Sequence, residues 1–464
     1  MITLLLLSAL QSSAVVINNT TVVDVENGRT QPGQSILLHQ GRILEVGPTV
    51  RAMPGAIRID GTGRYVIPGL WDMHVHAAMP YLDTLFLPLL VANGVTGVRE
   101  MWSGIEIMDT VRQNIGRGAL VGPRIYGSGN LVDGVPQIWP GSIGVETPEA
   151  GRSIVDSLAA RGAGFIKVYS RLSPETFRAI ADQARRRGIP IAGHIPTLVA
   201  AAEASDLGQR TVEHLTTITS ACSREETALR EETAAAVATA GRWDSAGKVQ
   251  RAQVTRLLNS YDEGRCRELA RRFVKNETWM VPTIVVLRSV AYLDDTTLAA
   301  DPRLVYIPAS MSRGWDPRQD FRFRMLTPED WARRKTAYQR QRDIIRLFKS
   351  EGVRFLAGTD LANPFIFPGF SLHEEMALMV QSGFTPLQAL QAATIEPARF
   401  LSGTDSLGTV AAGKVADLVL LEANPLENIK NTTRIAMVIL GGQVLDRGRL
   451  DQLLANGRAR VLTR

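Results

Sequence analysis

The sequence predicts an α/β protein that combines a (β/α)8 TIM barrel with a small β-sandwich built from both chain ends. Between residues 66 and 400, short apolar runs alternate with helical stretches, a pattern typical of a parallel sheet covered by helices. Eight such strand–helix units make up one barrel. Short strands and turns without helices occupy residues 15–65, and the same pattern returns in residues 401–464. We therefore expect one β unit, completed by both chain ends, beside a central barrel.

The N-terminal residues 1–14 resemble a signal peptide. Residues 2–10 form an apolar run, and Gln11 to Ala14 resemble a small-residue cleavage site, although no basic segment precedes them. We expect export to the periplasm or secretion; if these residues instead form a ragged first strand, a cytoplasmic protein is expected. No other segment reaches the roughly 18 apolar residues that a membrane span needs.

Each expected strand is a short apolar run bounded by turn residues. The N-terminal β unit contains the runs VVINNTTVVDV, SILLHQGRILEVG and AIRIDGTGRYV. The barrel strands are expected in the runs VIPGLWDMHVH, GVTGVREM, PRIYGSG, GFIKVYS, PIAGHI, TVEHL, WMVPTIVVL and VRFLAGTD. The C-terminal β unit contains SLGTV, AAGKVADLVLLEANP and IAMVILGGQVLD.

Helical periodicity fills most intervals between the barrel strands. In the stretch PETFRAIADQARRRG, apolar residues recur at helical spacing, and Gly188 follows it where a C-terminal cap belongs. Two intervals are longer than the others: a helical insertion at about 215–275 and a Pro- and Arg-containing loop at about 288–327. After that loop, Thr327 and Asp330 have the spacing of a capping box that opens the next helix.

Composition narrows the functional classes. The net charge of +6 is concentrated in residues 301–350, where basic residues lie on a helix-like run with interspersed acids and no aromatic stacking motif. We interpret this run as a solvated helix face and expect no nucleic-acid partner. The only two cysteines, Cys222 and Cys266, form no CxxC motif, which excludes a thiolate metal site. They form one disulfide if the protein is exported, and free thiols fit the sequence equally well.

Four of the six histidines stand at the ends of expected barrel strands. His74 and His76 end the first strand, and their i, i+2 spacing places both rings on one face, where they can bind a single ion. His194 ends the fifth strand, His214 the sixth, and Asp360 the eighth. Because the C-terminal strand ends of a barrel form one site, the pattern predicts a metal centre rather than isolated core histidines.

Lys167 lies in the fourth expected strand, in the same row of predicted ligands. An ammonium group has only donors and cannot bind a cation, so a lysine beside a metal would lose its proton or be modified into an anion. A carbamate formed with CO₂ would supply two oxygens that can bridge two ions. The alternative is a lysine that only extends from the barrel rim. His373 lies in an expected helix after the eighth strand, and we take it as structural.

In this order, the motifs resemble the amidohydrolase superfamily, in particular its imidazolonepropionase-like members and its Xaa-Pro and Arg/Lys-type metal-dependent dipeptidases. PGLWDMHVH is similar to the family's first-strand motif, and GFIKVY to its bridging-lysine strand. GHIP and EHL are similar to its two later histidine strands, and AGTD to its catalytic aspartate strand. Family members often carry Asp after the second-strand arginine, whereas this chain has Arg99-Glu100. We expect that departure to affect only local packing.

The resemblance implies a binuclear centre with two divalent metal ions, zinc by default. One ion would be held by His74, His76 and Asp360, and the other by His194 and His214. Lys167, carboxylated at N6, would bridge the two ions.

The expected chemistry is metal-assisted hydrolysis of an amide C–N bond in a small molecule, such as a dipeptide or N-acyl amino acid. A metal-bound hydroxide would attack the carbonyl, and Asp360 would pass the water's proton to the leaving nitrogen. Tyr169, two residues beyond Lys167, either donates to the developing oxyanion or only packs over the strand end. The loop at 288–327 carries arginines that would either receive a substrate carboxylate or remain surface charges: Arg303, Arg313, Arg318, Arg322 and Arg324.

Three other functions fit the same residues. A cyclic amide such as imidazolonepropionate would be opened by the same chemistry, and a lactone is also a possible substrate because hydroxide attacks esters. A secreted binding protein that retains the barrel without turnover is the non-enzymatic alternative, although it would have no chemical need for Asp360. We expect the protein to assemble as a homo-oligomer.

Overall fold

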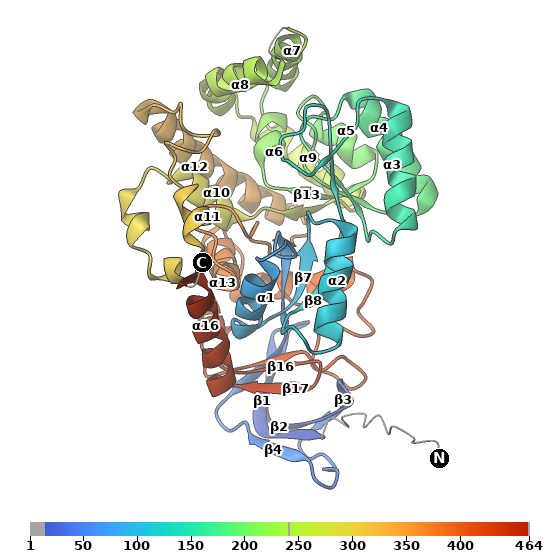
Figure 1. Cartoon of the computed structure of the whole chain (residues 1–464), viewed down its shortest axis with the longest axis vertical. Helices are drawn as coiled ribbons and strands as arrows, with labels where there is room; N and C mark the ends of the chain where they lie inside the picture. Colours follow the sequence, from blue (N-terminus) through green and yellow to red (C-terminus); the bar gives the residue numbers. More distant parts are fainter. Residues whose placement is uncertain (1–13, 240–241, 463–464) are drawn as a thin grey trace, which may run out of the picture.

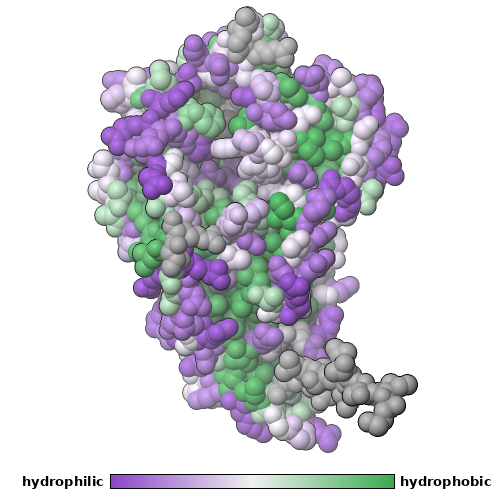
Figure 2. Space-filling view, viewed as in Figure 1, coloured by the Kyte–Doolittle hydropathy of each residue, from purple (hydrophilic) through white to green (hydrophobic). Residues whose placement is uncertain are grey.

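The computed structural model describes residues 14–239 and 242–462, so residues 1–13 of the expected signal peptide lie outside the described residues. The fold is a mixed α/β fold with parallel sheets. Figure 1 shows an elongated molecule, with the strands of the two chain ends at the bottom, parallel strands among helices in the middle, and two helices of the insertion at the top. On the face shown in Figure 2, hydrophilic residues dominate the outer edge of the helical half, and hydrophobic residues gather along the middle.

The two chain ends share one eight-stranded sheet, with the order β17-β16-β15-β5-β1-β2-β3 and with β4 paired to β1. Its strands are β1 (Val15–Asp24), β2 (Arg29–His39), β3 (Arg42–Gly47), β4 (Ile57–Asp60), β5 (Tyr65–Pro68), β15 (Leu418–Leu421), β16 (Ile435–Leu440) and β17 (Gln443–Asp446). Buried side chains such as Ile17, Ile36 and Leu420 form its core. The expected joining of both chain ends is therefore present, while the division into two stacked sheets stays a prediction.

The site-bearing strands form two parallel sheets. One contains β6 (Leu70–Val75), β7 (Val95–Glu100) and β8 (Arg124–Gly127). The other has the order β10-β9-β11-β12-β13-β14 and contains β9 (Leu131–Asp133), β10 (Ile143–Gly144), β11 (Ile166–Val168), β12 (Ile191–Gly193), β13 (Gln209–Glu213) and β14 (Trp279–Val281). All their pairings are parallel, as strand–helix alternation predicts.

The expected eighth strand, VRFLAGTD, connects these two sheets through isolated backbone bridges and does not form a continuous strand. The N–H of Met280 in β14 donates to the carbonyl of Arg354 at 2.9 Å, and the N–H of Asp360 donates to the carbonyl of His74 in β6 at 2.8 Å. Parallel bridges join Phe355 to Met280 and Leu361 to Val75. Residues 354–361 therefore run between β14 and β6 and bring Asp360 beside His74.

Most helices flank the parallel strands. Apart from the helices of the two long intervals, they are α1 (Asp83–Ala92), α2 (Ile105–Gly116), α3 (Pro148–Ala160), α4 (Pro174–Arg187), α5 (Ala201–Asp206), α10 (Ile284–Ala291), α12 (Pro328–Ser350), α13 (Phe370–Gln381), α14 (Pro386–Ala392), α15 (Ile395–Phe400) and α16 (Arg447–Leu462). Helix α16 instead packs against α1, β16 and β17. Gly188 ends α4 with φ 65°, and the capping box of Thr327 and Asp330 opens α12, so both predicted helix ends are confirmed.

One strand prediction is wrong in part. In the run WMVPTIVVL only Trp279–Val281 forms a strand, and the β-branched residues from Ile284 onward begin helix α10. Thr283 adopts a left-handed φ of 48° between them. The buried Glu375 carboxylate then accepts the backbone N–H groups of Ile284 and Val285 at 2.9 and 2.7 Å. This cap from a distant helix outweighs the local β propensity.

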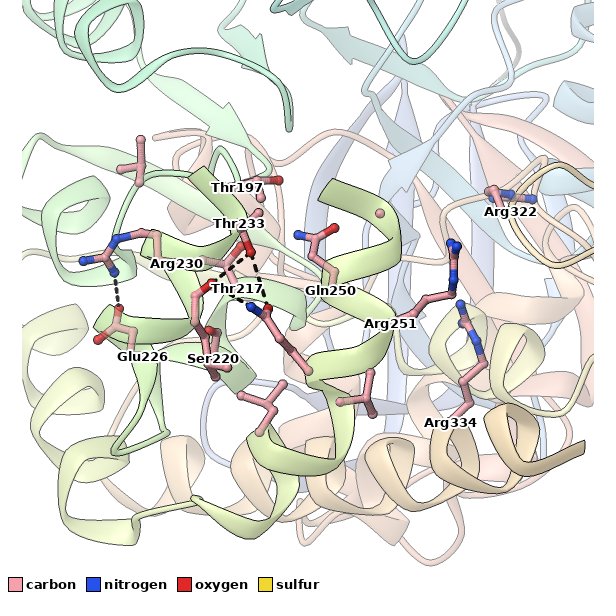
Figure 3. A pocket seen from close by; sticks show the side chains of 16 residues that line it. Thr197, Thr217, Ser220, Glu226, Arg230, Thr233, Gln250, Arg251, Arg322 and Arg334 are labelled. Atoms are coloured by element: carbon pink, nitrogen blue, oxygen red, sulfur yellow. Dashed lines mark hydrogen bonds and ion pairs between the residues drawn. The ribbon is translucent and has the colours of Figure 1, made fainter. Parts of the chain in front are cut away.

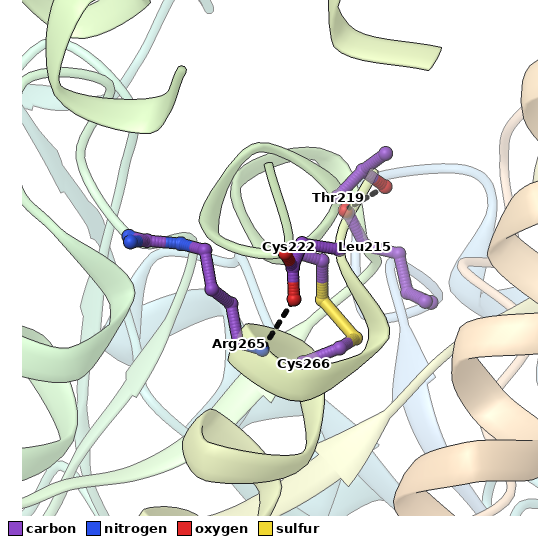
Figure 4. Close-up of a disulfide and its surroundings, with 6 residues drawn as sticks. Leu215, Thr219, Cys222, Arg265 and Cys266 are labelled. Atoms are coloured by element: carbon purple, nitrogen blue, oxygen red, sulfur yellow. Dashed lines mark hydrogen bonds between the residues drawn. A yellow bond between two sulfur atoms is a disulfide. The ribbon is translucent and has the colours of Figure 1, made fainter. Parts of the chain in front are cut away.

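The two long intervals fold as helices and turns. The described residues of the first interval contain α6 (Thr216–Ala221), α7 (Glu226–Val237), α8 (Arg242–Asn259) and α9 (Glu263–Lys275). The second contains η1 (Thr296–Ala300), η2 (Pro302–Tyr306) and α11 (Ala309–Arg313). A disulfide between Cys222 and Cys266 joins the end of α6 to α9 (Figure 4), which decides the alternative that the sequence leaves open. Across residues 14–239 and 242–462, no helix is long and apolar enough to cross a membrane.

Candidate metal centre

The Asp360 carboxylate lies among three imidazoles. Its Oδ1 is 3.2 Å from Nε2 of His74 and 3.0 Å from Nε2 of His76, and its Oδ2 is 3.6 Å from Nε2 of His214. Single ligand atoms of His74, His214 and Asp360 lie within 4.8 Å of one another. The ring centroid of His194 is 4.9 Å from that of His214. The structure thus brings together all four strand-end histidines and the predicted aspartate.

These side chains occupy the C-terminal ends of parallel strands. His74 lies in β6 and His76 just after it, while His194 follows β12 and His214 follows β13. His214 and Asp360 adopt left-handed φ values of 62° and 58°, which non-glycine residues rarely do. Such conformations persist only where the surrounding structure holds them, and they concentrate at functional sites. Both side chains line a cavity of about 440 Å³.

Three imidazoles are fixed through Nδ1, which leaves Nε2 free to bind. The Nδ1 of His74 contacts Oε2 of Glu213 at 2.8 Å. The Nδ1 of His194 contacts the Ser170 hydroxyl at 2.9 Å, and that of His214 contacts the Thr283 hydroxyl at 2.6 Å. Metal-binding histidines are typically oriented in this way by a second polar group. A set of imidazole nitrogens converging on a carboxylate fits a divalent transition-metal ion.

Burial keeps most of the imidazoles in the form that binds metal. It lowers the pKa of His214 to about 4, and it also lowers the pKa of His76 and, more strongly, of His194. For His74, burial acts to lower the pKa, but the neighbouring Asp360 and Glu213 carboxylates together outweigh it and raise the pKa. A metal ion would displace a proton from that ring, because a ligand imidazole must be neutral.

Lys167 lies in β11, lines the same cavity and is almost fully buried, with its Nζ 5.9 Å from the Tyr169 ring centroid. Burial lowers the pKa of this amine to about 8, although the Glu213 and Asp360 carboxylates oppose the shift. Space for the lysine depends on Gly193 in the next strand. A Cβ atom at Gly193 would lie 2.2 Å from the Val168 carbonyl oxygen and 3.0 Å from Cδ of Lys167.

Arg99 and Glu213 form a fully buried ion pair behind the site, which the sequence motifs did not reveal. The Arg99 guanidinium donates to Glu213 at 2.8 and 3.0 Å, to the Thr211 hydroxyl at 3.0 Å, and to the Met73 carbonyl at 2.7 Å. Because Glu213 contacts the Nδ1 of His74, Arg99 acts on this predicted ligand through Glu213. The sequence offered one signal for the role of Glu213, its position directly before His214. Because neighbouring side chains of a strand point to opposite faces, Glu213 had to point away from the face on which His214 lies.

Glu100 also has a wider role than the local packing that we expected. Its Oε2 accepts the backbone N–H groups of Ala77 and Ala78, both at 2.8 Å, and so holds the turn directly after His76. Its Oε1 is 3.9 Å from Nδ1 of His76. Burial raises the pKa of Glu100 to about 7. The Arg99-Glu100 pair therefore supports two predicted ligands, and the expectation of a purely local effect was wrong.

Aromatic residues form one wall of the cavity. The Tyr169 hydroxyl accepts a hydrogen bond from Nε1 of Trp139 at 2.8 Å, and the Tyr169 ring is 4.0 Å from that of His194. Trp102 lies between His76 and Trp139, with ring centroids 6.0 and 6.2 Å away. Tyr169 thus faces the histidine cluster, while His373 is bonded elsewhere, to Thr432 and the Asn93 carbonyl.

Of the five loop arginines proposed from sequence, only Arg322 lines this cavity in the described part of the chain. Arg303 instead pairs with Asp301 and Glu374, both at 2.7 Å. Arg318 is exposed and pairs with Asp316 at 2.7 Å. A further arginine of the cavity, Arg334, comes from α12, which the loop hypothesis did not include.

Comparisons with known proteins show the family and the fold of this chain. Residues 65–445 match the family model described as the amidohydrolase family. Bottromycin amidohydrolase is 25% identical, with a TM-score of 0.74, over 97% of this chain and 90% of that chain. A Xaa-Pro dipeptidase with bound methionine is 21% identical, with a TM-score of 0.66, over 94% of this chain and 100% of that chain, which shows the likeness of fold.

Among curated sequences the likeness is local. Dihydropyrimidinase 1 of Caenorhabditis elegans is 44% identical over 71 residues, which are 15% of this chain and 14% of that protein. The match thus spans about one seventh of that relative, whereas the family model covers most of this chain. The chain therefore belongs to the amidohydrolase family of metal-dependent hydrolytic enzymes.

Proposed function

We propose that this protein hydrolyses an amide C–N bond of a small molecule, such as a dipeptide or N-acyl amino acid. The observation that carries the proposal is the approach of three histidine Nε2 atoms to the Asp360 carboxylate inside a cavity. The proposed scaffold is a closed (β/α)8 barrel over residues 66–400 beside a β-sandwich of residues 15–65 and 401–464. The hydrogen bonds of residues 354–361 to β14 and β6 support closure of the barrel.

The proposed centre holds two divalent ions, zinc by default. His74, His76 and Asp360 would hold one, His194 and His214 the other, and carboxylated Lys167 would bridge them. His214 also lies close to Asp360, with its Nε2 3.6 Å from the Asp360 Oδ2. Ions held here would polarise a substrate carbonyl and make hydroxide available near neutral pH.

The protein's own residues position the substrate and move the proton. Burial acts to raise the pKa of Asp360, but the His74 and His214 imidazoles outweigh it and hold the pKa well below its usual range. The carboxylate is thus ionised and able to take a proton from the attacking water and deliver it to the leaving nitrogen. Burial raises the pKa of Tyr169, so its hydroxyl stays protonated and able to donate to the developing oxyanion.

Metal removal and reconstitution test the proposed function. We expect metal-depleted protein to be inactive, and zinc to restore hydrolysis of N-acyl amino acids or dipeptides with two equivalents bound by elemental analysis. His76→Asn should lower the bound metal, whereas His39→Asn, the same change in β2 of the end sheet, should leave metal content and turnover unchanged. Fully loaded protein without turnover on a broad amide and ester panel would support the binding-protein alternative instead.

Lys167 carboxylation has its own expected pH dependence. Only the neutral amine reacts with CO₂, and with a pKa of about 8 its neutral fraction falls about tenfold for each pH unit below that value. Carbamate formation also releases a proton (R–NH₂ + CO₂ → R–NHCOO⁻ + H⁺). At fixed CO₂ pressure, the carbamate on metal-free protein should therefore increase by about a hundredfold per pH unit below pH 8, and by about tenfold per unit above it until the lysine is saturated. Carbon-13 NMR with labelled CO₂ measures the carbamate, and the signal of Lys167→Met gives the background from the other amines, which is subtracted. A signal that Lys167→Met does not reduce contradicts the assignment.

The second candidate is a cyclic amide. The local identity to dihydropyrimidinase 1 favours a cyclic substrate, because the name of that enzyme refers to a dihydropyrimidine, which is a ring compound. Faster turnover of cyclic amides or lactones than of N-acyl amino acids would make this candidate the better one.

Export also belongs to the proposal, supported by the apolar residues 2–10 and by the Cys222–Cys266 disulfide. We also propose that the protein assembles as a homo-oligomer, and light scattering tests this by measuring its molar mass in solution.

A further inference from the structure

We propose that Arg251, Arg322 and Arg334 form an oxyanion subsite that receives the far, negatively charged end of an elongated amide substrate. The proposal rests on the proposed hydrolase function and adds a substrate class to it. The acceptor would be a second cavity, beside the histidine cavity and distinct from it.

The second cavity lies between the helices of the insertion and α12. It has a volume of about 400 Å³ and is bounded by residues of α6, α7, α8 and α12. Arg322 and Arg334 line both this cavity and the histidine cavity of about 440 Å³. The two cavities therefore adjoin at these side chains, and we place the far end of the substrate beyond the two arginines, in the second cavity.

Three guanidinium groups gather at this boundary (Figure 3). Arg251 extends from α8 and Arg334 from α12, and both lie on the same side of the cavity as Arg322. Arg322 pairs with Asp320 at 2.6 Å, but within the described residues neither Arg251 nor Arg334 forms an ion pair. The nearest acid on α12, Asp330, is occupied by Arg333 at 2.6 Å and by the helix cap. The boundary therefore has an excess of positive charge.

The position of Arg334 suits recognition of a planar anion. Its guanidinium carbon lies 5.1 Å from the Phe323 ring centroid and 6.0 Å from that of Trp331, so aromatic faces support the group. Burial lowers the pKa of Arg334, and the nearby Arg322 and Arg251 charges add to that effect. A bound carboxylate or phosphate would relieve this repulsion and accept paired hydrogen bonds.

The other residues that line the two cavities indicate which chemical groups separate the anionic end of the substrate from its amide. Apolar side chains of Val199, Leu229, Val254 and Leu257 face the second cavity. At its far end Arg230 is neutralised by Glu226 at 3.2 Å, so the positive excess lies on the side shared with the histidine cavity. Trp102 and Trp139 line the histidine cavity and offer an apolar surface for the acyl group. The geometry favours an apolar acyl amide whose amine part ends in an oxyanion several atoms away.

Kinetics with a length series tests the subsite on the full-length, metal-loaded enzyme. The substrates are N-benzoyl derivatives of straight-chain ω-amino acids, from the glycine derivative upward, with their methyl esters and the matching ω-phosphates. We expect kcat/KM to pass through a maximum at a chain longer than glycine. The methyl esters should be poorer by about tenfold to a hundredfold, mainly through KM, as for a hydrogen bond to a charged group. A phosphate preferred over the carboxylate would identify the oxyanion as phosphate.

Matched variants connect that preference to the named side chains. Arg334→Gln and Arg251→Gln should remove most of the advantage of the acids over the esters, measured as the ratio of the two kcat/KM values within each variant. Arg346→Gln, in the same helix but paired with Asp343, should leave that ratio unchanged. Calorimetric binding of the longer acids to the inactive Asp360→Asn protein should weaken in the same two variants. Equal turnover of acids, phosphates and esters, unchanged by Arg334→Gln, overturns the subsite alone, whereas no hydrolysis of any amide overturns the proposed function.

Discussion

Asp360→Asn should lower kcat by about 10²–10⁴-fold, the range that a positioned general acid–base contributes. The amide keeps the size of the carboxylate but cannot take a proton from water and pass it to a leaving nitrogen. Asp360 also contacts the Nε2 atoms of His74 and His76, so the variant removes the negative charge that these rings face. Steady-state kinetics on metal-reconstituted protein, with the bound metal measured on the same sample, gives the result.

The metal content separates the two roles of this carboxylate. A variant that binds the normal amount of metal and loses turnover has lost the proton transfer, whereas a variant that loses metal has lost a ligand. An ester with a good leaving group provides a control, because such a leaving group needs no proton. We expect Asp360→Asn to damage ester hydrolysis less than amide hydrolysis. Activity on amides within tenfold of the parent protein would rule out Asp360 as the proton carrier.

The sequence predicted which side chains lie together because the relevant pattern is local. Each predicted ligand stands directly after a short apolar run, and the C-terminal ends of parallel strands meet at one edge. His74, His194, His214 and Asp360 therefore come together although almost 300 residues separate the first from the last. Strand–helix alternation likewise predicted the parallel sheets, and the helix-free strand patterns at residues 15–65 and 401–464 predicted the joining of both chain ends.

The remaining features depend on contacts that no local pattern encodes. Helix α10 begins inside a β-branched run because Glu375, about 90 residues later, caps it. Single hydrogen bonds with the Ser170 and Thr283 hydroxyls orient His194 and His214, yet isolated hydroxyl residues carry no sequence signal. The loop arginines were predicted as one group, but nearby acids neutralise Arg303 and Arg318, and α12 supplies Arg334 instead.

Arg99→Met should be the most destabilising of the substitutions considered, by about 3–5 kcal/mol in the free energy of unfolding. Both Arg99 and Glu213 are fully buried, and removing one partner of such a pair leaves an uncompensated charge. Burial acts to raise the pKa of Glu213, but Arg99 and His74 outweigh it and hold the pKa below its usual range, so the carboxylate is charged. Denaturant unfolding measures the loss, and Arg112→Met, which breaks the part-exposed pair with Asp109, should cost only about 0–1 kcal/mol.

A double variant distinguishes the buried charge from lost packing. If the uncompensated Glu213 carboxylate causes the loss, Arg99→Met combined with Glu213→Gln should be more stable than Arg99→Met alone, since the amide is neutral. If lost contacts of the guanidinium with Phe165 and Phe400 dominate, the second substitution should bring no recovery. The amide oxygen introduced by Glu213→Gln can still accept a hydrogen bond from His74. Recovery of stability together with partial recovery of metal binding would therefore identify Arg99 as the residue that keeps Glu213, and through it His74, in place.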